Sequence, residues 1–219
     1  MKSIKDQIIS GGMVPVFNHT DKEIAFRVVK ACYDAGLRVF EWTNRGAEAA
    51  GLFKGIKEYV DKNCPGMLLG AGSVFDGEIC RKFHGMGASF IVSPFLDPDL
   101  ASACKELKVL WIPGCGTVTE IHQAQKWGAD IVKIFPGDAV GGPGFVKAVL
   151  GPMPWAQIMP TGGVSPDPEN LKAWFKSGVC CVGMGSQLFT KERISDPDPE
   201  NLILEIRRTL KIIEECRKK

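Results

Sequence analysis

Short apolar segments typical of β-strands recur along the chain, and segments with helical spacing separate them. In the helical segments an apolar residue returns every three or four positions, as it does on one face of an amphipathic helix. The last of these places Leu202, Ile206, Leu210 and Ile213 on one face and charged residues on the other. The apolar segments predict strands at residues 13–17, 37–43, 67–71, 89–92, 109–113, 130–135, 157–161 and 179–184.

A strand followed by a helix, repeated eight times, predicts a (β/α)8 TIM barrel rather than a doubly wound sheet. Residues 131–135 are apolar on both faces, as in a parallel strand that is covered on both sides, and only Lys133 breaks this pattern. We expect one α/β domain over residues 1–219. A short N-terminal helix near residues 3–10, with Ile4 and Ile8 on its apolar face, is expected to close the barrel bottom. Residues 190–200 are polar and proline-rich and predict an exposed loop.

Composition and charge narrow the function classes. The formal net charge of +2 provides no strong field for nucleic acid or an anionic membrane, so neither is expected as a partner. The chain has neither a signal-peptide pattern nor an apolar stretch of about 18 residues that could span a membrane. The eight cysteines include no Cys-x-x-Cys pair, and the three histidines do not cluster with them at zinc-ligand spacing. We therefore expect a cytoplasmic enzyme or binding protein without a metal.

Lys133 is the first candidate for chemistry. Period-two alternation places it with Ile131 and Phe135 on one face of the 130–135 strand. If that face points into the barrel, burial lowers the pKa of the amine and makes it a nucleophile towards carbonyl carbon. A buried lysine held by a salt bridge is the alternative interpretation.

Glu41 is a second ionisable residue on a predicted inward face, which it shares with Val39 and Thr43. A carboxyl group near a Schiff-base lysine can move protons to and from substrate carbon and oxygen. Its alternative role is a counter-ion for Lys133. Arg45, just beyond the strand end, could hold a substrate carboxylate through two hydrogen bonds, or could remain a solvated loop residue.

Two glycine-rich segments follow the last two predicted strands, namely Thr161-Gly162-Gly163 and Gly183-Met184-Gly185-Ser186. The loops after strands seven and eight of such barrels frequently bind phosphate through backbone N–H groups. Glycine lets the backbone approach an anion closely. Either segment alone is typical of a tight turn, but the two together favour a phosphate site.

The candidate residues belong to short blocks that occur in a fixed order along the chain, from about residue 14 to about residue 189. The blocks are Val14-Pro15-Val16, Glu41-x-Thr43-x-Arg45, Gly70-Ala71-Gly72-Ser73-Val74, Ser93-Pro94, Ile112-Pro113-Gly114, Val132-Lys133-x-Phe135-Pro136 and Pro160-Thr161-Gly162-Gly163-Val164. Together they resemble the KHG/KDPG aldolase family. Members are class I lyases that act on 2-keto-3-deoxy-6-phosphogluconate and, in some cases, on 4-hydroxy-2-oxoglutarate.

The resemblance implies that Lys133 forms the Schiff base and that Glu41 is the general acid and base. Retro-aldol cleavage would then give pyruvate and glyceraldehyde 3-phosphate, or pyruvate and glyoxylate from the smaller substrate. The protonated imine accepts the electrons of the broken bond, so no cofactor is expected. The family also implies that the protein forms a homotrimer and that its substrate is a small phosphorylated keto acid.

The resemblance also assigns the substrate-binding residues. Arg45 and Ser73 would hold the pyruvyl carboxylate, Thr161 would contact the substrate near the Schiff base, and Phe135 and Pro94 would form pocket walls. The phosphate would bind at Gly162, Gly163, Gly185 and Ser186.

This chain departs from the family pattern at two places. Ser73 stands where threonine is usual, and it keeps the hydroxyl. Phe17-Asn18-His19 stands where many members have an apolar residue and an arginine, which leaves the preferred sugar acid open. Thr161 slightly favours a gluconate-type over a galactonate-type substrate. The alternatives are another phosphosugar barrel, such as an isomerase or a decarboxylase, and a non-catalytic phosphosugar-binding barrel.

Overall fold

The computed structural model describes residues 2–218, in which strands and helices alternate along the chain. The strands are β1 (Met13–Phe17), β2 (Val39–Thr43), β3 (Leu68–Gly72), β4 (Phe90–Val92), β5 (Leu110–Ile112), β6 (Gly114–Cys115), β7 (Val132–Ile134), β8 (Ile158–Pro160) and β9 (Val182–Met184). The helices are α1 (Ile4–Gly11), α2 (Lys22–Asp34), α3 (Ala49–Asn63), α4 (Gly77–Gly85), α5 (Pro98–Leu107), α6 (Val118–Lys126), α7 (Gly142–Leu150), α8 (Pro168–Lys176), α9 (Lys191–Ser195) and α10 (Glu200–Arg217).

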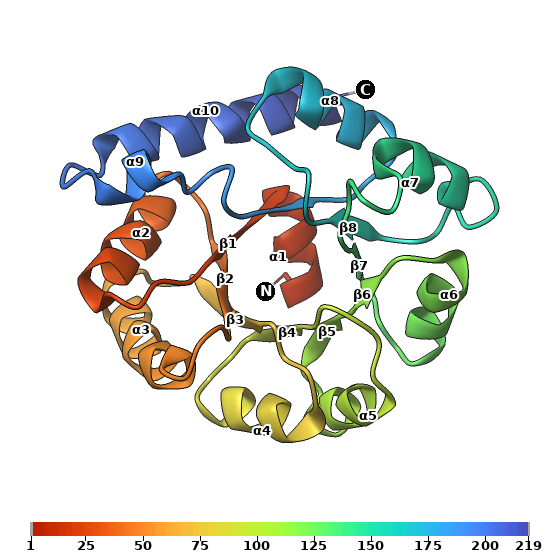
Figure 1. Cartoon of the computed structure of the whole chain (residues 1–219), viewed down its shortest axis with the longest axis horizontal. Helices are drawn as coiled ribbons and strands as arrows, with labels where there is room; N and C mark the ends of the chain where they lie inside the picture. The colour runs from red at the N-terminus through yellow and green to blue at the C-terminus, as the bar shows by residue number, and fades with distance from the viewer. Residues whose placement is uncertain (1, 219) are drawn as a thin grey trace.

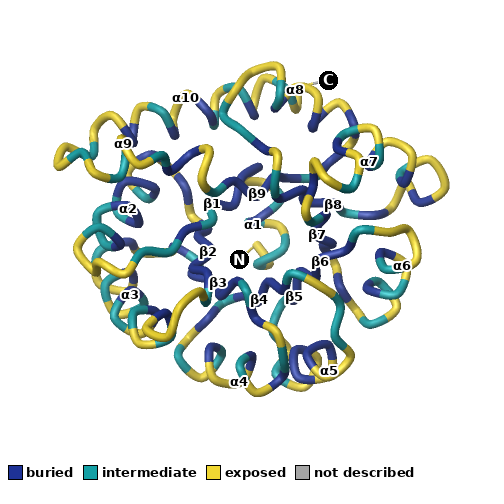
Figure 2. Tube along the Cα trace, in the orientation of Figure 1, coloured by how far each residue is buried: buried dark blue, intermediate teal, exposed yellow. Residues whose placement is uncertain are grey.

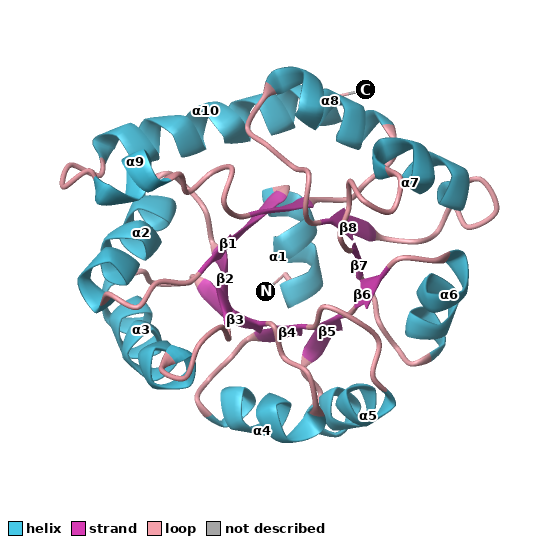
Figure 3. Cartoon of the chain, in the orientation of Figure 1, coloured by secondary structure: helices cyan, strands magenta, loops and turns pink. Residues whose placement is uncertain are grey.

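The strands form a ring of parallel neighbours, and the helices surround it (Figures 1 and 3). Their order is β5-β4-β3-β2-β1-β9 in one sheet and β6-β7-β8 in the other. A parallel bridge between Thr161 and Gly183 joins β8 to β9. β5 lies within the predicted fifth strand, residues 109–113, whereas β6 lies just beyond its predicted end. Pro113, which has no N–H to donate to a strand ladder, separates the two. The predicted TIM-barrel fold with a short N-terminal helix is confirmed.

Alternating side chains divide the strand residues between two cores. The barrel interior is filled by Val14, Val39, Phe90, Val92, Ile112, Ile131, Met159 and Cys181. Intervening residues such as Phe40, Trp42, Val132 and Ile134 pack outward against the helices. Figure 2 shows the resulting buried ring, with exposed residues on the outer faces of the helices.

The helix α1 closes the N-terminal end of the barrel, as the sequence predicts. Its Ile8 is fully buried in the interior core, and Ile4 packs against that core. The helix begins with a capping box in which Ser3 and Asp6 bond each other's backbone N–H. Because α1 occupies this end (Figure 1), the barrel opens at the C-terminal ends of the strands, where a cavity lies.

The prediction of an exposed loop over residues 190–200 is wrong in its first half, where the structure has the short helix α9. Thr190 caps this helix by accepting a hydrogen bond from the Arg193 N–H. The Ile194 carbonyl accepts a hydrogen bond from Arg27, so α9 is held against α2. The segment is too short for helical periodicity to reveal, and its stability comes from these tertiary contacts.

Candidate active site

Lys133 lies at the centre of β7 and is only 6% exposed. Its strand neighbours Val132 and Ile134 point into the outer core, so Lys133 points into the barrel, as period two predicts. Its Nζ lies 4.8 Å from the centroid of the Phe135 ring, and the aromatic face stabilises the cationic form. Among the ion pairs of residues 2–218 none includes Lys133, which does not support the salt-bridged interpretation.

Burial is the largest cause of a lowered pKa at Lys133, and the positive charge of Arg45 acts in the same direction. The negative charge of Glu41 opposes both, but the pKa of the amine still falls below its usual value. A lower pKa increases the fraction of free amine near neutral pH, which is the form that attacks a carbonyl carbon.

Glu41 is 1% exposed and lies on the inward face of β2. Its carboxyl group lies over Gly72 of β3, where a β-carbon would overlap Oε1, so a larger residue at this position would displace the carboxyl group. Both carboxyl oxygens lack a hydrogen-bond partner within residues 2–218. Burial raises the pKa of Glu41, while the charges of Lys133 and Arg45 limit the rise. A carboxyl group with a raised pKa and free oxygens can both accept and donate a proton.

A cavity of about 400 Å³ opens at the C-terminal ends of the strands. The predicted residues that line it are Arg45, Phe135, Thr161, Gly162, Gly163, Gly185 and Ser186. Its lining also includes residues that were not among the predicted site residues, namely Val16, Phe17, Asn18, Thr43, Val164, Gly183, Gln187, Phe189 and Ile194. Phe17 and Asn18 belong to the segment where this chain departs from the family pattern, and that departure was the only sequence signal for them.

Four predicted site residues, Glu41, Lys133, Ser73 and Pro94, are not among the residues that line this cavity. Ser73 follows Gly72, and its φ of 55° lies in the left-handed region, which is strongly unfavourable for β-branched residues. Serine in place of the family's threonine suits this conformation while keeping the hydroxyl. The backbone carbonyl of Pro94 lies so close to Gly114 that a β-carbon there would overlap it, and Gly114 is the register neighbour of Lys133.

The loop after β8 is held in one conformation by α8. The Gly163 carbonyl accepts hydrogen bonds from the Asn170 amide, at 2.9 Å, and from the Trp174 indole, at 3.4 Å. Gly162 and Gly163 have φ values of 91° and 69°, which glycine adopts without strain. These contacts direct the Gly163 carbonyl towards α8 and fix the two glycines at the cavity wall.

A helical turn follows β9. The Gly185 carbonyl accepts hydrogen bonds from the N–H groups of Leu188 and Phe189. In a helical turn the N–H groups that precede the first hydrogen-bonded amide can bind an anion. Here those groups belong to Ser186 and Gln187. Both glycine-rich loops therefore border the same cavity, as the sequence predicts.

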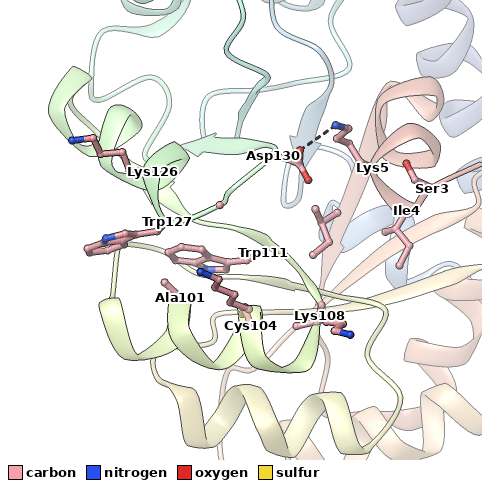
Figure 4. A pocket seen from close by; sticks show the side chains of 14 residues that line it. Ser3, Ile4, Lys5, Ala101, Cys104, Lys108, Trp111, Lys126, Trp127 and Asp130 are labelled. Carbon is pink, nitrogen blue, oxygen red and sulfur yellow. Dashed lines mark hydrogen bonds and ion pairs between the residues drawn. The ribbon is translucent and has the colours of Figure 1, made fainter.

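A second cavity, of about 540 Å³, lies at the opposite end of the barrel between α1, α5 and α6. Figure 4 shows that its labelled lysines do not converge: Lys5 pairs with Asp130, at 3.1 Å, while Lys108 and Lys126 extend in different directions. Among residues 2–218 there is also no group of three His, Cys, Asp or Glu side chains that could hold a metal ion. Within the same residues no helix is long and apolar enough to cross a membrane.

Comparison with known proteins separates the alternatives left open by the sequence. The family model for KDPG and KHG aldolases matches residues 4–204. The 2-dehydro-3-deoxy-phosphogluconate aldolase of Pseudoalteromonas atlantica is 34% identical over 90% of this chain and 88% of its own length. The KHG/KDPG aldolase of Escherichia coli is 32% identical over 91% of each chain.

A solved structure agrees with these relatives. The KDPG aldolase of Legionella pneumophila, with pyruvate captured as a covalent carbinolamine, superposes with a TM-score of 0.81. It is 26% identical, over 94% of this chain and 96% of its own. The family model and the relatives above 30% identity favour an aldolase over the alternatives of an isomerase, a decarboxylase or a non-catalytic barrel. The chain belongs to the KDPG and KHG aldolase family, and it is an aldolase and therefore a lyase.

Proposed function

We propose that the chain cleaves 2-keto-3-deoxy-6-phosphogluconate to pyruvate and glyceraldehyde 3-phosphate, and 4-hydroxy-2-oxoglutarate to pyruvate and glyoxylate. The observation that carries this proposal is a buried lysine in the same barrel interior as a buried glutamate, where within residues 2–218 the lysine has no ion-pair partner and the glutamate oxygens have no hydrogen-bond partner. The names of the relatives from Pseudoalteromonas and Escherichia agree with these substrates.

The reaction follows from the chemistry of this pair. The Lys133 amine attacks the keto carbon, and loss of water gives a protonated imine. Glu41 removes the proton of the C4 hydroxyl, the C3–C4 bond breaks, and its electron pair moves to the imine nitrogen. The aldehyde leaves, Glu41 returns a proton to C3 of the enamine, and water releases pyruvate and the free amine. Every proton and electron is accounted for within substrate, water and these two residues.

The remaining predicted residues are proposed to bind the substrate. Arg45 and Ser73 hold the carboxylate, Thr161 contacts the substrate beside the imine, and Phe135 and Pro94 limit the pocket. Arg45 is exposed at the cavity rim, from where a guanidinium can bind a carboxylate through two hydrogen bonds. The phosphate binds at Gly162, Gly163, Gly185 and Ser186.

The direct test is cleavage by the purified protein of the two proposed substrates, with released pyruvate measured by a coupled reduction to lactate. The galactonate-type epimer serves as the comparison substrate, because Thr161 favours the gluconate configuration. Release of pyruvate from neither proposed substrate would contradict the proposal. Faster cleavage of the galactonate epimer would correct the substrate and leave the aldolase chemistry in place.

We expect Gly163→Ala to lower kcat/KM for the phosphorylated substrate by about 30- to 100-fold, the loss of one to two hydrogen bonds to a charged group. A β-carbon at this position meets the Asp138 side chain and suffers strain at a φ of 69°, so the loop has to move. The binding energy of a remote phosphate helps to position the reacting bond. Cleavage of unphosphorylated 4-hydroxy-2-oxoglutarate should change several times less.

Two variants serve as controls. Gly66→Ala introduces similar backbone strain, at a φ of 80°, in the turn before β3, where no atom lies within 4 Å of the added carbon, and it should leave both substrates unaffected. Ser186→Ala removes a single donor, so we expect it to cost about 5- to 20-fold with the phosphorylated substrate. Equal losses with both substrates in Gly163→Ala would show that the glycines only turn the backbone.

We further propose that the protein is a cytoplasmic homotrimer. All eight cysteines are free thiols, which suits a reducing compartment. Phe75 and Phe95 follow β3 and β4, stack at 6.0 Å and are 44% and 46% exposed. Adjacent exposed apolar residues such as this aromatic pair are typical of an interface between copies.

We expect Phe95→Glu to reduce the sedimenting mass to roughly one third, because a carboxylate buried between copies is strongly unfavourable. Sedimentation velocity of both proteins gives the result. Leu204→Glu, an equally exposed apolar position on α10, is the control and should retain the mass of the wild type. A wild-type protein that sediments as a monomer would refute the trimer.

A further inference from the structure

Thr43 ends β2, two residues beyond Glu41 on the same inward face. It is 2% exposed and lines the cavity of the candidate active site. Its Oγ1 is buried and has no hydrogen-bond partner within residues 2–218. A buried hydroxyl without a partner destabilises a folded protein, and valine would have the same shape without this cost. The Thr43 hydroxyl is therefore explained if the substrate supplies its hydrogen-bond partner.

The Glu41 carboxyl group lies at the same level of the barrel as Thr43. Thr43 is in register with Gly72, and Glu41 extends over Gly72. No hydrogen bond joins Glu41 to Thr43, and both Glu41 oxygens are likewise free. Two unpartnered polar groups therefore adjoin the same interior space and can bind one substrate oxygen together.

The oxygen that fits between these groups is a neutral one. A substrate carboxylate beside Glu41 would be repelled when Glu41 is ionised, and Arg45 offers it a cation at the rim. A hydroxyl can donate to Glu41 and accept from Thr43 at the same time. On a 4-hydroxy-2-keto acid, the oxygen that alternates between hydroxyl and carbonyl during the reaction is the one on C4.

We propose that Thr43 is a substrate-positioning residue whose hydroxyl donates a hydrogen bond to the C4 oxygen, the atom from which Glu41 removes the proton. The inference rests on the proposed function. During cleavage the C4 proton passes to Glu41, the C3–C4 electron pair moves to the imine nitrogen, and the C4 oxygen becomes a carbonyl. The Thr43 O–H remains bonded to this oxygen throughout and aligns the C–O bond for departure. Thr43 thus acts on the hydroxylated part of the substrate and makes no contact with pyruvate.

The test compares Thr43→Val with Thr43→Ser in two reactions. We expect Thr43→Val to lower kcat/KM for cleavage of the phosphorylated sugar acid by about 10- to 100-fold, the range for a substrate hydroxyl that loses its partner. Thr43→Ser keeps the hydroxyl and should stay within about threefold of the wild type. Exchange of the pyruvate methyl hydrogens with deuterated water, which needs Lys133 and Glu41 but no C4 oxygen, should fall several times less in Thr43→Val than cleavage does.

Thermal stability separates the two roles, because the loss of a hydroxyl with a structural role would lower the Tm. Thr43→Val removes an unpartnered buried hydroxyl, so its Tm should equal or exceed that of the wild type. Thr209 is the matched control, because it is also buried but its Oγ1 donates to the Glu205 carbonyl at 2.8 Å, away from the site. Thr209→Val should leave both reactions unchanged and should not raise the Tm.

Three outcomes would overturn the inference: unchanged cleavage in Thr43→Val, equal losses of cleavage and exchange, or a lowered Tm that accompanies the kinetic loss. Failure of the wild type to form a borohydride-trapped pyruvate adduct on Lys133 would instead count against the proposed function itself. The two failures are therefore distinguishable.

Discussion

Lys133→Arg should abolish turnover with both proposed substrates, with a fall in kcat of at least about 10⁴-fold. A guanidinium remains protonated at every pH that proteins tolerate, so it has no free electron pair with which to attack the keto carbon. Arginine keeps the positive charge beside Glu41 and Phe135, so the change removes nucleophilicity rather than charge. A role as counter-ion alone would survive this substitution.

Covalent trapping identifies the nucleophile independently of turnover. Incubation of the wild type with pyruvate and borohydride should reduce the imine and add a stable adduct to Lys133, which peptide mass spectrometry locates. Lys176→Arg, at an exposed position on α8, is the control and should retain both adduct and activity. An adduct on a different lysine, or the absence of any adduct, would refute the assignment of Lys133.

The barrel and the inward position of its two ionisable residues could be predicted because alternation in a strand has a period of two. Outward packing of Phe40 and Trp42 leaves Glu41 inward, and Val132 and Ile134 do the same for Lys133. The glycine loops were predictable because parallel strands end at one rim. The inward positions of Glu41 and Lys133 required only neighbours along one strand, and the shared rim required only the order of the strands.

Features that depend on side chains from separate strands could not be predicted in this way. The sequence shows a glycine at position 72 but gives no reason for it. Only the structure shows that the Glu41 carboxyl group occupies the space above this glycine. Likewise, Thr43 was recognisable as inward, but the missing partner of its hydroxyl is a property of the whole barrel. The helix α9 depends on contacts with α2 that no local pattern encodes.

Glu41→Gln should lower kcat for cleavage by roughly 10²–10⁴-fold, the usual contribution of a positioned acid and base. Glutamine fills the same space over Gly72 but cannot take the C4 proton or return one to C3. Imine formation should persist in part, because the Lys133 amine is still present. The carboxylate of Glu41 raises the pKa of Lys133 against the effect of burial. Its removal lowers that pKa further and leaves more free amine at acidic pH.

The pH dependence of trapping therefore tests the coupling of the two residues. In Glu41→Gln the acidic limit of pyruvate adduct formation should move to lower pH than in the wild type, while cleavage remains slow at every pH. Arg45→Gln is the opposite control: the charge of Arg45 lowers the pKa of Lys133, so its loss should move the limit to higher pH. If Glu41→Gln retained nearly normal kcat, Glu41 would be only a counter-ion for Lys133. In that case a different group would have to move the protons on C3 and on the C4 oxygen.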